Sequence, residues 1–245
     1  MLFKLCLSVV FGLIILLSQL SPANAASPHE IKDKLPDPST VEKLTKNAVS
    51  PNFLDALQNA ASDLQDYKCF CRLISFKDEQ WKDFGGAILF YKQKERLRAE
   101  IVSSDYRNGS VVVKQSDGKI RGKGGGGLSL LKMTIQPDSR SIKLPTGFSL
   151  AESDFLSLYS SIKKQVANGA SANISAPTSI PAFKDQVQIL AMRGKDNGLT
   201  HIIYFDPHTK LPLAWNTYAD GHSHAYVFFD PPDVNKGLSD ELFKL

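Results

Sequence analysis

The sequence predicts an α+β protein built on a strongly curved antiparallel sheet, an incomplete and unclosed β-barrel, with helices covering its concave side. Short strand-like runs separated by turn residues fill much of the chain, and two amphipathic helical stripes interrupt them. The C-terminal runs 202–205 and 225–229 are apolar on both faces, where a half-buried strand would alternate. Something apolar must therefore cover both faces of that part of the sheet.

The first 25 residues predict an export signal that is not part of the fold. Lys4 gives a positive start, residues 5–17 are apolar, and Ala23-Asn24-Ala25 has the small-x-small pattern of a cleavage site. About 13 apolar residues are too few for a bilayer span, which needs roughly 20. We expect cleavage after Ala25 and a soluble mature protein in the periplasm or another extracytoplasmic space.

The mature chain is predicted to have a lead and one domain. Residues 26–49 are rich in Pro, Ser and charge, which predicts a flexible lead with one helical turn near 41–46. Residues 50–245 suffice for a single sizeable domain, and we expect a monomer. The formal net charge of +4 is too small for a nucleic-acid surface unless the basic residues cluster.

Two helices are predicted from capping signals and periodicity. Ser50-Pro51 begins the first helix, and Ser149 with Glu152 forms a capping box ahead of the second, which ends near Gly169. Their apolar residues recur at helical spacing: Phe53, Leu54, Leu57, Ala60, Ala61 and Leu64 in the first helix, and Phe155, Leu156, Tyr159, Ile162 and Val166 in the second.

Between the two helices the sequence predicts a meander of strands. The turn signals are Lys77-Asp78, Asn108-Gly109, Asp117-Gly118 and Pro137-Asp138. The run Gly124 to Gly127 interrupts the meander as a flexible turn, a bulge, or a place where a ligand or another backbone comes close. The predicted strands span residues 67–76, 87–93, 96–102, 110–115, 119–122, 128–135 and 140–143.

After the second helix, residues 170–181 predict an exposed loop and residues 187–192 a strand. Three consecutive strands then follow within residues 200–230. Asp206-Pro207 and Asp220-Gly221 supply the residue types that antiparallel hairpins need at their turns. Ser239 is expected to cap a last short helical turn near the C-terminus.

The sequence offers little evidence of catalysis, and we expect neither an enzyme nor a cofactor. No nucleophile motif is present. A zinc site of Cys69, Cys71, His222 and His224 is a remote alternative that requires the first and last strands to be neighbours. The two cysteines are more simply interpreted as small buried apolar residues, because a bridge between them would close a strained ring.

The densest basic stretch, residues 92–98, has two interpretations. It can be the solvated end of a hairpin, or a patch for anionic lipid head groups or an acidic partner. Several basic residues further along the meander would extend such a patch if the strands are adjacent: Lys114, Lys119, Arg121 and Lys123.

The order of elements resembles that of a known family. A helix precedes Asp66-Tyr67, a meander follows, and the segment Tyr204-Phe-Asp-Pro-His-Thr-Lys-Leu-Pro-Leu-Ala-Trp is similar to the strand-turn-strand of the LolA-like proteins, the periplasmic carriers of outer-membrane lipoproteins. The closing Gly237-Leu-Ser-Asp-Glu-Leu-Phe also fits, so the resemblance covers roughly Asn52 to Leu245. It implies one LolA-like domain over 50–245, an unclosed barrel lined by apolar residues with helices as a lid.

The favoured function is a non-catalytic carrier or binder of lipids or lipoprotein acyl chains in an apolar cavity. Its partners would be a lipid or acylated protein cargo and a membrane surface or membrane-bound protein. The alternatives are a periplasmic sensor or scaffold that binds a protein partner and, remotely, a zinc-dependent enzyme. From strand position alone, the candidate cavity residues are Phe90, Ile101, Val112, Ile203, Phe205 and Trp215.

Overall fold

The computed structural model describes residues 26–103 and 107–245, and the expected export signal and its cleavage site lie outside these ranges. The strands are β1 (Asn47–Ala48), β2 (Asp66–Lys77), β3 (Gln80–Lys92), β4 (Arg96–Ser103), β5 (Val111–Lys114), β6 (Ile120–Lys123), β7 (Lys132–Ile135), β8 (Ser171–Ile174), β9 (Gln188–Arg193), β10 (Leu199–Phe205), β11 (Pro212–Ala219), β12 (His222–Phe229) and β13 (Asp233–Val234). The α-helices are α1 (Pro28–Asp33), α2 (Pro38–Leu44), α3 (Pro51–Ser62) and α4 (Phe155–Ala167). Short 3-10 helices are η1 (Gly126–Leu128), η2 (Arg140–Ile142), η3 (Leu150–Glu152) and η4 (Asp240–Phe243).

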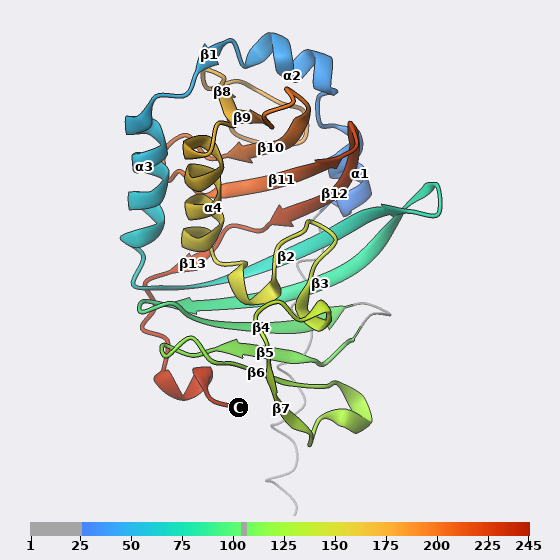
Figure 1. Ribbon diagram of the computed structural model, residues 1–245, viewed down its shortest axis with the longest axis vertical. Coiled ribbons are helices and arrows are strands. Elements are labelled where there is room, and N and C mark those ends of the chain that lie inside the picture. The colour runs from blue at the N-terminus through green and yellow to red at the C-terminus, as the bar shows by residue number, and fades with distance from the viewer. Residues whose placement is uncertain (1–25, 104–106) are drawn as a thin grey trace, which may run out of the picture.

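The described strands form one antiparallel sheet in the order β1-β8-β9-β10-β11-β12-β2-β3-β4-β5-β6-β7, with β13 beside β2. The sheet curves and does not close, because β1 and β7 remain at its two ends (Figure 1). The predicted fold class, a curved antiparallel half-barrel with helices, is confirmed. None of the helices in the described ranges combines the length and apolar character needed to cross a bilayer.

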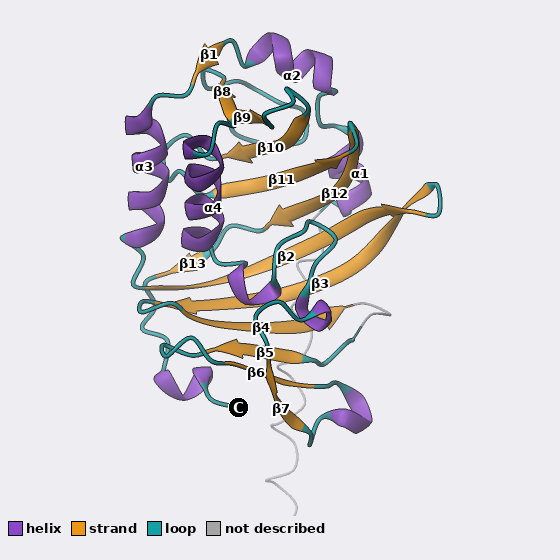
Figure 2. Ribbon diagram, in the orientation of Figure 1, coloured by secondary structure: helices purple, strands orange, loops and turns teal. Residues whose placement is uncertain are grey.

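The C-terminal strands are buried on both faces, as their sequence predicts. We call the face that carries Ile203 and Trp215 the inner face; α3 and α4 pack against it. The opposite, outer face carries Ile202 and Tyr204, which pack with side chains of α1 and α2. Figure 2 shows α3 and α4 side by side across β9 to β12. Each face therefore has its own cover.

The cover of the outer face comes from residues 26–49, which differ from the expected flexible lead. They contain α1, α2 and β1, and Val41 of α2 is only 1% exposed. Pro28 and Pro38 stand in the first helical turns, where a missing N–H costs nothing. Ser27 and Asp37 cap these turns with side-chain oxygens. The same prolines that indicated a linker thus begin two helices.

Three local predictions need correction. Residues 140–143 are not a strand: Ser139 accepts a hydrogen bond from the Ser141 backbone N–H and begins η2. The strand predicted over 128–135 is shorter, because Leu128 ends η1 and β7 begins only at Lys132. Residues 170–181, expected to be a loop, contain β8, which pairs with β9 and β1.

A buried carboxylate joins the start of the sheet to the end of the chain. Asp66, at the start of β2, is 3% exposed. Its oxygens accept hydrogen bonds from three consecutive backbone N–H groups, those of Lys236 (2.8 Å), Gly237 (3.0 Å) and Leu238 (2.9 Å). Asp66 and the segment 237–243 are two parts of the sequence on which the family resemblance rests, and they are bonded to each other.

We predict that Asp66→Ala lowers the free energy of unfolding by about 3 kcal/mol, because three backbone N–H groups lose their shared carboxylate acceptor. The measurement is urea unfolding followed by tryptophan fluorescence. Asp63→Ala is the control: Asp63 is exposed at the end of α3 and should change the free energy by less than about 0.5 kcal/mol. Equal effects of the two substitutions would contradict the proposed role of the Asp66 carboxylate.

Candidate functional site

The inner face of the β2 to β6 half of the sheet encloses a cavity of about 460 Å³. We call residues 139–153, which include η2 and η3, the strap; they cross over this half of the sheet (Figure 1). The strap and Leu158 of α4 form the roof, and Trp215 of β11 stands at one side. Leu128 and Met133 also line the cavity and are 59% and 54% exposed, so the cavity opens to solvent there.

The space exists because the strands beneath it carry short side chains. Gly85, Gly86 and Ala87 of β3 line the cavity, as does Gly122 of β6. A methyl group at Gly122 would meet the side chain of Ile135. Residues of this size leave room between the sheet and the strap that larger apolar side chains would fill. The remaining lining is mostly apolar and includes Leu73, Leu89, Ile101, Val112, Phe148 and Phe229.

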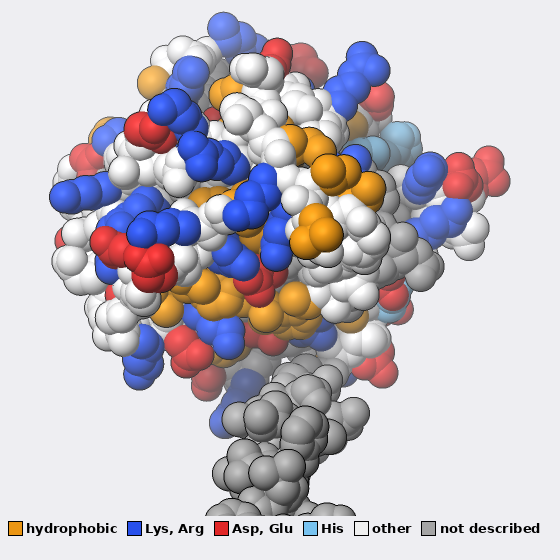
Figure 3. Space-filling view, turned by 90° about the horizontal axis from the view of Figure 1, so that it is seen from below, with side chains coloured by type: hydrophobic (Ala, Val, Ile, Leu, Met, Phe, Trp, Pro, Cys, Tyr) orange, Lys and Arg blue, Asp and Glu red, His pale blue; other side chains and the backbone are white. Residues whose placement is uncertain are grey.

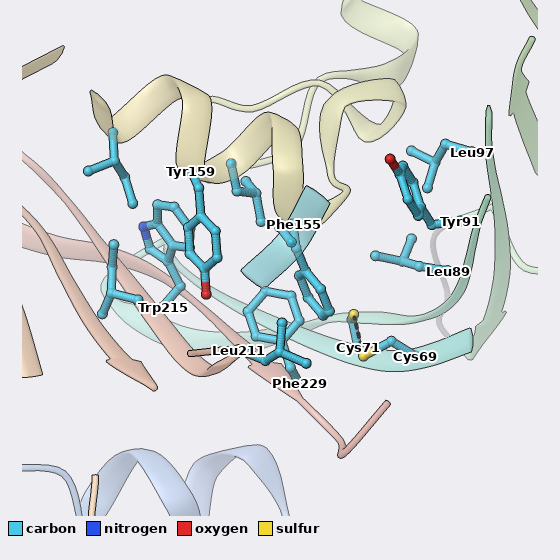
Figure 4. Packing of buried hydrophobic residues seen from close by; sticks show 14 of the residues in the cluster. Cys69, Cys71, Leu89, Tyr91, Leu97, Phe155, Tyr159, Leu211, Trp215 and Phe229 are labelled. Carbon is cyan, nitrogen blue, oxygen red and sulfur yellow. Dashed lines mark hydrogen bonds between the residues drawn. The ribbon is translucent and has the colours of Figure 1, made fainter. Parts of the chain in front are cut away.

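Next to the cavity the inner face is packed solid. Phe155 and Tyr159 project from α4 toward the sheet, and Figure 4 shows Tyr159 beside Trp215 and Phe155 above Leu211 and Phe229. The Phe155 ring stacks on Tyr67 with 4.5 Å between ring centroids, and the Phe155 N–H donates to the Tyr67 hydroxyl oxygen (3.0 Å). This packing fixes α4, and α4 in turn holds Leu158 over the cavity.

A histidine supports the aromatic wall of the cavity. The Trp215 indole N–H donates to Nδ1 of His201 (3.3 Å), and Phe148 of the strap meets Trp215 edge to face with 5.5 Å between ring centroids. Burial lowers the pKa of His201 to about 4. His201 is thus neutral at pH 7 and accepts a hydrogen bond, which gives it a structural role.

Three of the six candidate cavity residues line the cavity. Ile101, Val112 and Trp215 are brought together there from β4, β5 and β11. Ile203 and Phe205 lie on the same face but within the packed core. Phe90 points to the outer face, where it packs near Val113 and Phe243. The glycines and the strap residues were missed, because no periodic signal marks them.

The four candidate metal ligands do not converge. The strand that carries the cysteines, β2, does pair with the strand that carries the histidines, β12. In this pairing, however, Cys71 lies opposite Phe229. His224 lies five residues further along β12, about 16 Å away at roughly 3.3 Å per residue. In the described ranges no three His, Cys, Asp or Glu side chains form a group suited to a metal.

Cys69 and Cys71 are buried free thiols with their sulfurs 3.9 Å apart. Both side chains lie on the inner face (Figure 4), and Cys71 lines the cavity. Burial raises the pKa of the Cys71 thiol. A protonated thiol is a poor nucleophile, so this sulfur contributes apolar surface to the cavity wall.

The basic stretch 92–98 is engaged within the chain. Lys92 and Arg96 both pair with Asp240 of η4, at 2.5 and 2.9 Å. Arg98 pairs with Glu100 and donates to the carbonyl oxygen of Leu242. These side chains hold the C-terminal segment against the outer face, which leaves them less able to serve as a patch for a partner.

Close backbone approach explains the first half of the glycine run. A Cβ at Gly125 would collide with the carbonyl oxygen of Asn108, and one at Gly124 would meet Leu128. Gly126 has a φ of +53°, a left-handed conformation that favours glycine. Among the described residues, neither Gly126 nor Gly127 has a neighbour at the position of a Cβ. The run therefore packs at its start and turns outward at its end.

Known proteins resemble this one in structure but not in sequence. No family model and no curated protein matches the sequence. The structure is similar to that of MucB, with a TM-score of 0.51 and 12% identity over 79% of this chain and 62% of MucB. It is also similar to an uncharacterized conserved protein from Thermus thermophilus, with a TM-score of 0.50 and 11% identity over 78% of this chain and 91% of the other.

A LolA superfamily protein from Nitrosomonas europaea is matched with a TM-score of 0.40 and 7% identity, over 81% of this chain and 99% of that protein. The fold is thus similar to those of these proteins, a LolA superfamily member among them. At these identities the similarity concerns the fold alone, so the function must be argued from the cavity.

We predict that His201 makes the protein less stable in mild acid. The unfolded histidine has a pKa of about 6.5 and the folded one about 4, so the unfolded state binds more protons between these values. Stability attributable to His201 is fully present above pH 6.5 and is lost as the pH falls toward 4. Because the ring is not completely buried, we expect a loss of about 2 kcal/mol.

The measurement is urea unfolding at pH 7.0 and pH 4.5 for the unsubstituted protein and for His201→Gln. The Gln variant keeps an acceptor for the Trp215 N–H but cannot titrate. The difference in its free energy of unfolding between pH 7.0 and pH 4.5 should therefore be smaller by about 2 kcal/mol than that of the unsubstituted protein. An identical pH dependence in both proteins would contradict the prediction.

Proposed function

We propose that the protein is an exported, non-catalytic carrier that holds a lipid, or the acyl chains of a lipoprotein, in the cavity. The observation that carries this proposal is an apolar space of about 460 Å³ that the protein's own side chains leave unfilled and that opens to the surface. Pockets of roughly 300–1,000 Å³ are typical of small-molecule sites. On the neighbouring half of the inner face, apolar side chains fill the space between the sheet and the helices. An unfilled cavity is therefore not a general property of this sheet.

An acyl chain suits both the lining and the energetics. Each methylene removed from water contributes about 0.8 kcal/mol, so about eight enclosed methylenes would contribute about 6 kcal/mol before the entropy of association is subtracted. Lys123 and Lys143 also line the cavity. They could neutralise a carboxylate or phosphate head group while the chain lies against Leu89, Ile101 and Val112.

Carriage rather than catalysis is supported by the character of the lining. The Cys71 thiol has a raised pKa, and His201 bonds to Trp215 with the ring nitrogen that a base would need free. The expected export signal places such a carrier outside the cytoplasm, where a soluble protein that shields acyl chains from water would be useful.

We predict that Ile101→Trp weakens binding of a fluorescent fatty acid at least tenfold, because the larger ring occupies the cavity. The measurement is the increase of fluorescence on titration with the delipidated protein. Val102→Trp is the matched control: Val102 is the next residue of β4, is 40% exposed and points to the other face. It should leave the affinity within about twofold.

Thermal unfolding of both variants separates cavity filling from loss of the fold. A delipidated protein that fails to shield the fatty acid from water would contradict the carrier function. Equal weakening by the two tryptophans would instead show that the fatty acid binds outside the cavity.

A further inference from the structure

The connection between β6 and β7 exposes large apolar side chains to water. We call residues 124–133 the docking loop. Leu130 is 90% exposed, Leu128 59%, Leu131 58% and Met133 54%. These are four of the six most exposed large apolar residues described in the protein, and they fall within six consecutive positions. A contiguous patch of this kind is costly in water and marks an interaction surface.

Positive charge is concentrated around the same loop. Residues 120–143 hold five Lys or Arg residues and one Asp, which gives +4, equal to the net charge of the entire chain. The rest of the chain therefore sums to zero. Figure 3 views the molecule from this end, and hydrophobic side chains lie beside Lys and Arg on that surface. The five basic residues, none of which forms an ion pair within the described ranges, are Arg121, Lys123, Lys132, Arg140 and Lys143.

Two of these cations face each other at the base of the loop. Lys123 of β6 and Lys132 of β7 are register partners in the antiparallel pair. Like charges directly opposite each other destabilise a sheet, and β7 is a short edge strand with little burial to offset that cost. An anion between or above the two ammonium groups would turn this repulsion into attraction.

We propose that the docking loop inserts into the interface of an anionic lipid bilayer and so presents the mouth of the cavity to the membrane. The leucines would enter the boundary between head groups and acyl chains, while the flanking cations bind anionic head groups. The purpose of this docking rests on the proposed carrier function, but the docking itself depends only on the loop.

The shape of the loop favours a bilayer over a protein surface. Gly126 and Gly127 turn the chain outward, and η1 projects from the lower end of the sheet in Figure 1. A protruding apolar tip needs a matching groove on a protein, whereas a bilayer deforms around it. The distribution of cations on both sides of the tip also fits a uniformly anionic surface.

The loop and the cavity share residues. Leu128 and Met133 line the cavity and also belong to the exposed patch, and Lys123 lines the cavity at the base of the loop. Insertion would therefore place the opening of the cavity at the depth of the lipid acyl chains. A chain could then pass between bilayer and cavity with little contact with water.

The test is flotation of the purified mature chain with vesicles, at low and high salt. Vesicles of phosphatidylcholine with about one third phosphatidylglycerol should bind the protein, and pure phosphatidylcholine should bind it at least tenfold more weakly. Leu130→Asp should reduce binding to anionic vesicles at least tenfold, because it puts a charge at the most exposed apolar position. Added salt should also weaken binding.

Phe76→Asp is the matched control. Phe76 is 41% exposed, lies at the hairpin between β2 and β3, and receives the same change from apolar to acidic. It should leave vesicle binding within about twofold. Binding that survives Leu130→Asp, equal binding to both vesicle types, or no binding to either would overturn the proposal; in the last case, capture of a protein partner by the loop would assign it to a protein contact.

Fatty-acid binding in solution separates this inference from the carrier function. Leu130 does not line the cavity, so Leu130→Asp should bind the fluorescent fatty acid as the unsubstituted protein does. Loss of vesicle binding with fatty-acid binding intact supports the docking loop. Vesicle binding by a protein that binds no fatty acid would leave the docking loop standing and contradict the carrier.

Discussion

The architecture depends on one constraint, which is that β9 to β12 are apolar on both faces and so need two covers. Helices α3 and α4 cover the inner face, and α1 and α2 cover the outer face. Val41, at 1% exposure, is the most buried residue of that outer cover. With both faces packed, this half of the sheet is a rigid support. The strap and α4 can therefore span the other half without collapsing onto it.

Polar contacts attach the C-terminal segment to the outer face of the other half of the sheet, near β3 to β5. The Asp66 carboxylate captures the backbone at 236–238, and the pairs of Lys92 and Arg96 with Asp240 continue the attachment to η4. Phe243 of η4 is thereby buried near Val113 on the outer face. The C-terminal segment thus packs on the outer face of this half, whereas the cavity that Ile101 and Val112 line lies on the inner face.

The sequence predicted the class of fold because its strongest signals are local: turn residues, capping residues and periodicity. It also predicted that a second cover must exist, but not that the lead supplies it, since Pro28 and Pro38 indicate a linker and a helix start equally. Of the candidate cavity residues, Ile101, Val112 and Trp215 line the cavity and the other three do not, for a related reason. Alternation shows that Phe90 and Leu89 face opposite ways, but only the register, in which Leu89 faces Ala99, reveals which one shares a face with Val112. The cavity itself exists because Gly85, Gly86 and Gly122 have no side chains to fill it. The absence of a side chain gives no periodic signal in the sequence.

For the proposed carrier function, the position of the cavity mouth matters because moving an acyl chain through water is costly. Each exposed methylene costs about 0.8 kcal/mol, so a chain of about a dozen carbons that left the cavity into water would face roughly 10 kcal/mol. A mouth bordered by the exposed Leu128 and Met133 avoids most of that cost only if those residues themselves meet lipid. Their exposure is unfavourable for a protein that stays in water, and the facing charges of Lys123 and Lys132 add to it. Contact with an anionic lipid bilayer would remove both costs, because the apolar side chains would leave water and the two lysines would meet anionic head groups. We therefore interpret the cavity and the docking loop as parts of one lipid-binding site.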